Sequence, residues 1–104
     1  MARFDVFAHP DATLRKRTPY LLDVQNNHIS RIATRVVLPM RLANDFEQRV
    51  GELNPLFEIN GIEVVLDTAA LAAFPAAELK KTVATLQGQS EMITGALDVL
   101  LGAC

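Results

Sequence analysis

The sequence of 104 residues has no tryptophan, one tyrosine and a single cysteine, which is its last residue, Cys104. One cysteine cannot form an intrachain disulfide, so an apolar core has to hold the fold, and a reducing compartment is favoured. No apolar run approaches the roughly 20 residues that a membrane span needs, and the first residues lack the apolar core of a signal peptide. We therefore expect a cytoplasmic protein with no membrane partner.

Familiar catalytic and metal-binding motifs are missing as well. The sequence contains no Gly-rich phosphate loop, no zinc-ligand spacing and no nucleophile elbow. The two histidines, His9 and His28, are 19 residues apart, and Cys104 is remote from both, so a metal site is a poor interpretation. We expect a protein that is not an enzyme and has no catalytic residue, metal or cofactor. We expect it to act by binding another macromolecule.

Charge is low overall but unevenly distributed. The formal net charge is −2, which argues against a general nucleic-acid binder. Residues 1–52 carry 8 basic and 6 acidic side chains, whereas residues 53–104 carry 2 basic and 6 acidic ones. The densest basic run is Arg15, Lys16 and Arg17. Such a run is either a solvated loop or a docking site for an acidic peptide or a phosphate.

Length and patterning predict one domain, residues 1–104, with many short strands. Alternating or β-branched segments predict strands at residues 3–7, 20–25 and 35–38, the last closed by Pro39. The dipeptide Asn60-Gly61 between two β-rich runs predicts a two-residue hairpin turn that pairs Glu58 with Glu63 on a solvated face.

Helical signals are weaker except at the end of the chain. Leu42, Phe46 and Val50 recur every four residues, which predicts a short helix over residues 42–50. The final segment carries a broad apolar stripe, formed by Met92, Ile93, Ala96, Leu97 and Leu100. Because a chain of this size builds only a modest core, we expect the stripe near Leu97 and Leu100 to support a homodimer.

Several short segments, taken in order and at matching spacing, resemble the CcdB family over essentially the whole chain. They are residues 21–25, Arg35 to Pro39, Leu53-Asn54-Pro55, Val65 to Thr68, Val83 to Leu86 and Gly95-Ala96-Leu97-Asp98. The resemblance implies a mainly β (α+β) fold: a five-stranded antiparallel sheet in an SH3-like barrel, with a small wing and a C-terminal α-helix at a homodimer interface. It places residues 42–50 in the wing region and residues 72–75 in a strand.

The resemblance also implies a function. Family members are toxins of bacterial toxin–antitoxin pairs that bind the A subunit of DNA gyrase and trap the enzyme on cleaved DNA. An antitoxin with a disordered, acidic C-terminal segment wraps the toxin, and the two together bind operator DNA and repress their own operon. We expect that acidic segment to use Arg15, Lys16 and Arg17, because rim charges of this kind steer association.

The resemblance further implies which residues contact gyrase. They are His28, Ile29, Asp98, Leu101, Gly102, Ala103 and Cys104. Two positions depart from the family pattern: His28 replaces an apolar residue, and Gly102 stands where the best-known members have the Trp of a Trp-Gly-Ile ending. Loss of an aromatic anchor from an interface centre costs about 2 kcal/mol or more, roughly a thirtyfold loss of affinity.

Three interpretations follow. The first is a gyrase-directed toxin. The second is a degenerate member that keeps the dimer and the antitoxin grip without poisoning gyrase. The third is an endoribonuclease toxin on the same barrel, which rests on a fold-level analogy, because the Arg-Pro motif of those enzymes is not found near the start of this sequence.

Overall fold

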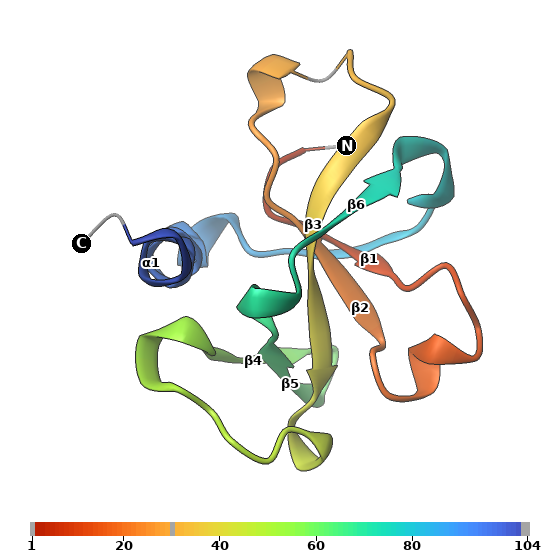
Figure 1. The fold of residues 1–104 in the computed structure, drawn as a ribbon. Coiled ribbons are helices and arrows are strands. Elements are labelled where there is room, and N and C mark those ends of the chain that lie inside the picture. The colour runs from red at the N-terminus through yellow and green to blue at the C-terminus, as the bar shows by residue number, and fades with distance from the viewer. Residues whose placement is uncertain (1, 30, 103–104) are drawn as a thin grey trace.

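A computed structural model describes residues 2–29 and 31–102. Within these residues, seven strands form one antiparallel sheet in the order β4-β5-β3-β2-β1-β7, with β6 paired to β3 off this path. The sheet curls into a half-barrel beside a C-terminal helix (Figure 1). The elements are β1 (Asp5–Ala8), β2 (Tyr20–Asp23), β3 (Thr34–Leu42), β4 (Leu56–Ile59), β5 (Ile62–Leu66), β6 (Ala72–Pro75), β7 (Thr82–Thr85) and α1 (Ser90–Leu101). The expected fold class is confirmed, but the expected count of five strands is wrong.

The long strand β3 accounts for the larger count. Residues 34–37 pair with β6 and residues 40–42 pair with β5 on the same side, while β2 pairs along the other side. The hairpin of β4 and β5, which we call the wing hairpin, therefore joins the main sheet through β3. Pro39 lies inside this strand, contrary to the prediction. Its carbonyl accepts the Asp67 N–H at 2.9 Å where β5 gives way to β6, so the missing proline N–H falls at a gap in the ladder.

The hairpin prediction is confirmed. Asn60 and Gly61 both have positive φ, 51° and 83°, as a type I′ turn requires. The register pairs Glu58 with Glu63, and both side chains are exposed to solvent. Water therefore screens the repulsion between the two carboxylates, and the opposite face of the hairpin is free to enter the core.

Strand alternation buries both faces of the sheet. One face, which includes Val6, Leu22 and Leu38, packs with the helix residues Ile93 and Ala96 into the main core cluster. The other face carries a smaller cluster of Phe7, Leu21, Val37 and Leu79. Burial of a side chain such as Ile93 stabilises the fold by about 1.5–3 kcal/mol. The amphipathic prediction for the last helix is confirmed.

The local helix signal over residues 42–50 is overruled by tertiary context. Residues 42–50 contain the end of β3, a short 3-10 turn at Ala43–Asp45 and extended chain, with no α-helix. Residues 72–75 form the strand β6, as the family resemblance implies. In the described part of the chain, no helix is long and apolar enough to cross a membrane.

Candidate functional surfaces

The connection between β2 and β3 carries two of the predicted gyrase contacts. A short 3-10 turn at Asn27–Ile29 presents His28 and Ile29, and both side chains are exposed. The side chain of Asn26 accepts the N–H of His28 at 2.9 Å, and its carbonyl accepts the N–H of Ile29 at 3.1 Å. This Asx turn fixes the direction of both side chains locally.

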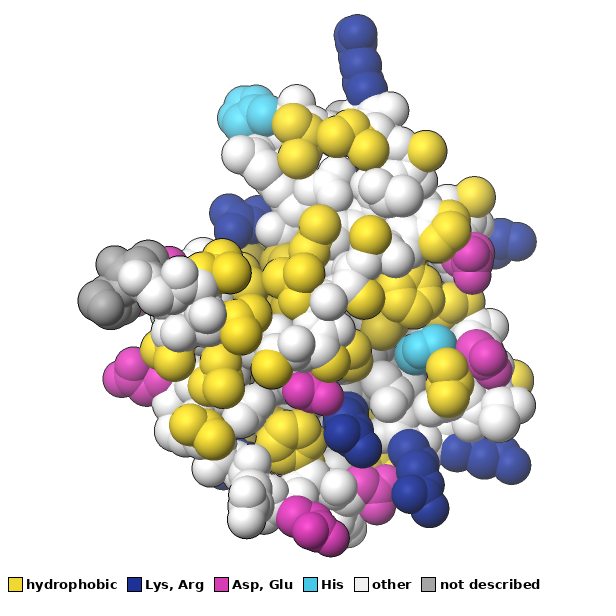
Figure 2. Space-filling model, in the orientation of Figure 1, with side chains coloured by type: hydrophobic (Ala, Val, Ile, Leu, Met, Phe, Trp, Pro, Cys, Tyr) yellow, Lys and Arg dark blue, Asp and Glu magenta, His cyan; other side chains and the backbone are white. Residues whose placement is uncertain are grey.

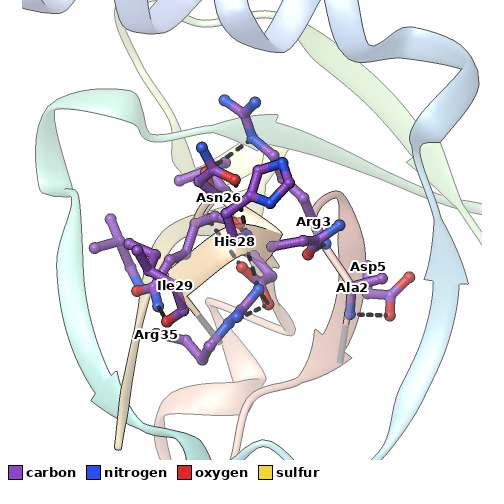
Figure 3. A network of polar contacts seen from close by, with 12 residues as sticks. Ala2, Arg3, Asp5, Asn26, His28, Ile29 and Arg35 are labelled. Atoms are coloured by element: carbon purple, nitrogen blue, oxygen red, sulfur yellow. Dashed lines mark hydrogen bonds and ion pairs between the residues drawn. The ribbon is translucent and has the colours of Figure 1, made fainter. Parts of the chain in front are cut away.

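A buried polar network anchors that connection to the sheet (Figure 3). The Arg35 guanidinium donates to the Asp23 carboxylate at 2.7 and 2.8 Å, and both side chains are almost fully excluded from solvent. Asp23 also accepts the N–H of Gln25 at 3.0 Å. The Gln25 side chain in turn donates to the Ile29 carbonyl at 3.2 Å and accepts the Val36 N–H at 3.0 Å.

The protonation of Asp23 reflects two opposing effects. Burial raises the pKa of the Asp23 carboxyl above its ordinary value, whereas the Gln25 N–H and the Arg35 guanidinium pull that pKa back down. The ion pair is therefore held together by its hydrogen bonds, and every buried side-chain nitrogen and oxygen among the described residues has a partner.

The other described contacts lie at the C-terminal end of α1. Asp98 is exposed, and Leu101 is 72% exposed, the highest value among the large apolar side chains. Gly102 ends the helix in the left-handed conformation, φ 75°, and its N–H donates to the Asp98 carbonyl. Ala103 and Cys104 lie outside the residues that the structure describes.

Within one chain these two groups of residues lie apart. Figure 1 shows the β2–β3 connection at the top of the view and the C-terminal end of α1 at the left. The side chains of His28 and Ile29 therefore do not form one continuous surface with Leu101 and Gly102 in a single chain. A partner that contacts both groups has to be large, or a second copy of the chain has to complete the surface.

The two predicted dimer residues are both half-buried. Leu97 packs against the main core of its own chain, and Leu100 is partly exposed near the helix end. Exposed apolar side chains continue around them, including Val99 and Leu71, each 41% exposed. Because α1 packs against the 3-10 turn at Thr68–Ala70, this apolar surface runs from the helix onto the start of β6. Figure 2 shows apolar side chains spread from the helix at the left toward the centre of the face.

The basic run lies in the connection between β1 and β2. A 3-10 turn at Leu14–Lys16 presents Arg15, Lys16 and Arg17, all of them exposed. The Arg15 Nε–H donates to the His9 carbonyl at 2.8 Å, which ties the loop to the end of β1. Figure 2 shows several Lys and Arg side chains at the lower right, the side on which Figure 1 places this loop.

The sequence patterns did not reveal the role of Asp23, Gln25 and Arg35. Their signal is a carboxylate, an amide and a guanidinium inside otherwise apolar strand segments, where an unpaired charge is too costly to bury. For metal binding, the described residues contain no group of three or more His, Cys, Asp or Glu side chains that could hold an ion.

Comparison with known proteins gives one finding. The family model described as CcdB protein matches residues 3–102, which is nearly the whole chain. No curated protein matches the sequence significantly.

Proposed function

The chain belongs to the CcdB family, and from that premise we propose that it is the toxin of a type II toxin–antitoxin system that binds the A subunit of DNA gyrase. In this proposal the toxin traps gyrase on cleaved DNA, and gyrase itself supplies the chemistry. A cognate antitoxin neutralises the toxin, and toxin and antitoxin together bind operator DNA and repress their operon. Family membership supports the toxin–antitoxin assignment in general; the partners and the mechanism are the proposal.

The observation that carries the proposal is the family match over residues 3–102. It is supported by an exposed end of α1, where Asp98 and Leu101 are open to a partner. A surface of this kind needs no catalytic group, because it acts by binding. A buried ion pair holds the second predicted contact, the connection with His28 and Ile29, in a fixed position.

We propose that a homodimer completes this surface. The apolar side of α1 near Leu97 and Leu100 continues onto Leu71, and an exposed apolar area of this kind is stabilised by a partner. Pairing two copies along it brings two helix ends together. One large partner then contacts both tails at once, which raises the effective affinity of each.

Gly102 decides how strong the gyrase contact is. An added Cβ at Gly102 meets no atom within 4 Å, so there is room for a side chain, but the φ of 75° is unfavourable for any residue except glycine. Left-handed geometry costs an ordinary residue about 1–2 kcal/mol. A Trp at this position therefore offers gyrase a ring for a cation–π contact worth about 0.5–2 kcal/mol but strains the helix end.

The experiment measures binding of a fragment of the gyrase A subunit by calorimetry, together with growth on expression of the full chain. Deletion of residues 102–104 is expected to abolish gyrase binding and toxicity while dimerisation remains. G102W is expected to bind gyrase more tightly than G102A, which carries the same left-handed strain without the ring. If the truncated chain is as toxic as the intact one, the tail is not the effector and the proposed mechanism is wrong.

A second candidate is a family member that binds its antitoxin without poisoning gyrase. The absence of tryptophan and the presence of Gly102 at the anchor position favour it. It predicts that the intact chain is harmless on expression and binds no gyrase fragment, yet still forms a complex with the product of a neighbouring antitoxin gene. Toxicity without gyrase binding, together with cleavage of added RNA, would support the endoribonuclease interpretation instead.

A further inference from the structure

A groove with a volume of about 730 Å³ lies where β1 ends and β2 begins. Its apolar lining includes Ala8, Pro19 and Val83, from three neighbouring strand ends and connections. Ile62, next to the tip of the wing hairpin, belongs to the same lining and is 39% exposed. The groove therefore lies between the wing hairpin and the outer strand β7, away from the C-terminal end of α1.

Cations line this groove. Arg15, Lys80 and Lys81 belong to its lining, against a single acidic side chain, Glu78. All three cations are exposed, and none forms an ion pair with a side chain in residues 2–29 or 31–102. The chain as a whole has a net charge of −2, so this concentration of positive charge runs against its average. Unpaired cations around an apolar groove attract an anionic ligand that also offers apolar groups.

The lining favours a peptide over a nucleic acid. Single-stranded nucleic acids bind by stacking their bases on exposed aromatic rings along a basic track. The only aromatic ring that lines this groove is Tyr20, apart from the His9 imidazole, and both side chains are buried. Glu78 also lies among the cations and repels a continuous phosphate chain. An extended peptide avoids both problems, because its side chains alternate in direction every residue.

We propose that this groove binds an extended acidic peptide in which carboxylates alternate with small apolar side chains. The carboxylates contact Arg15, Lys80 and Lys81, and the apolar side chains lie on Ala8 and Val83. In naming the antitoxin's acidic segment as the source of that peptide, the inference rests on the proposed function. It adds Lys80 and Lys81 to the basic run of the β1–β2 connection and places antitoxin binding on a surface separate from the gyrase-binding tail.

The test uses the full-length chain and a synthetic ten-residue peptide of alternating Glu and Val, with calorimetry at low salt. The variant K80E/K81E is expected to lower the peptide affinity about tenfold or more, because two attractive contacts become repulsive. R31E is the matched control: Arg31 is also exposed, but it lies in the β2–β3 connection at the far end of the sheet. It should change the affinity less than about twofold once salt screens the general charge effect.

Three results would overturn the inference. The first is that the Glu–Val peptide does not bind, and the second is that the wild type and K80E/K81E bind it equally well. The third is that a single-stranded oligonucleotide binds more tightly than the peptide and that K80E/K81E abolishes its binding. Binding of the gyrase fragment is measured on the same proteins. If the peptide binds the groove but no variant binds gyrase, the groove inference stands and the proposed function fails. If the gyrase fragment binds but the peptide does not, the proposed function stands and the groove inference fails.

Discussion

Replacement of Arg35 by Met removes one half of the buried ion pair and leaves the Asp23 carboxylate without its main partner. Both side chains are nearly inaccessible to solvent, and their closest nitrogen–oxygen distance is 2.7 Å. Removing one partner of such a pair costs about 3–5 kcal/mol, because the remaining charge stays buried. A domain of this size has a total stability of about 5–15 kcal/mol, so R35M is expected to be severely destabilised.

The pH dependence identifies the cause of that loss. Burial already raises the pKa of the Asp23 carboxyl, and without Arg35 the opposing attraction disappears, so the pKa of Asp23 rises further. A raised pKa means that the folded state holds the proton more tightly than the unfolded state, whose pKa is about 3.9. The stabilisation that comes from protonating Asp23 is therefore fully present below the unfolded-state pKa, and it is lost as pH rises through the folded-state pKa. R35M should lose less stability at pH 4.5 than at pH 7.

Urea unfolding followed by circular dichroism at both pH values measures the effect. The double variant D23N/R35M is the matched control: the Asn side-chain oxygen still accepts the Gln25 N–H, but no charge is left buried. It should recover most of the stability lost by R35M. Amide exchange at Val36 should quicken in R35M, because the Val36 N–H donates to the side chain of Gln25, a residue whose backbone carbonyl accepts a hydrogen bond from Arg35. A cost below about 1 kcal/mol, or a cost equal at both pH values, would refute this account.

The remaining predictions concern assembly, association and acid stability. L100D should raise the dissociation constant of the proposed homodimer at least about tenfold, and sedimentation of the wild type as a monomer at roughly 50 µM would contradict that proposal. Reversal of Arg15, Lys16 and Arg17 to Glu should slow antitoxin association and flatten its salt dependence in stopped-flow kinetics; unchanged values would mean a merely solvated loop. Burial lowers the pKa of His9, so stability should fall as pH drops below about 6.5 toward the folded-state pKa, and H9N should flatten that slope in thermal unfolding.

The parts of the fold that were predictable are those in which one local signal is decisive. Asn60 and Gly61 need positive φ, so the hairpin and its register follow from two residues. The apolar stripe of the last helix likewise matches one face of a helix and nothing else. By contrast, the apolar spacing over residues 42–50 is compatible with a helix and with a wing segment, and only the folded chain shows that β3 ends at Leu42 and is followed by a 3-10 turn at Ala43–Asp45.

The surfaces were less predictable because they depend on which segments meet in space. Arg15 is visible as part of a basic run, but nothing local connects it with Lys80 and Lys81, which come 65 and 66 residues later in the sequence. Pro39 was misread as a strand end, because the gap between β5 and β6 that accommodates it exists only in the folded sheet. The partner of Asp23 is hidden in the same way, since β2 and β3 are joined by a long connection.

The end of α1 and the basic groove are separate surfaces, so a change at one should not affect binding at the other. The tail surface depends on the end of α1, whereas the basic groove depends on the ends of β1, β2 and β7, which lie on another side of the sheet. No described hydrogen bond links Gly102 or Leu101 to the residues that line the groove. A charge change at Lys80 and Lys81 should therefore leave gyrase binding intact, and deletion of the tail should leave peptide binding intact.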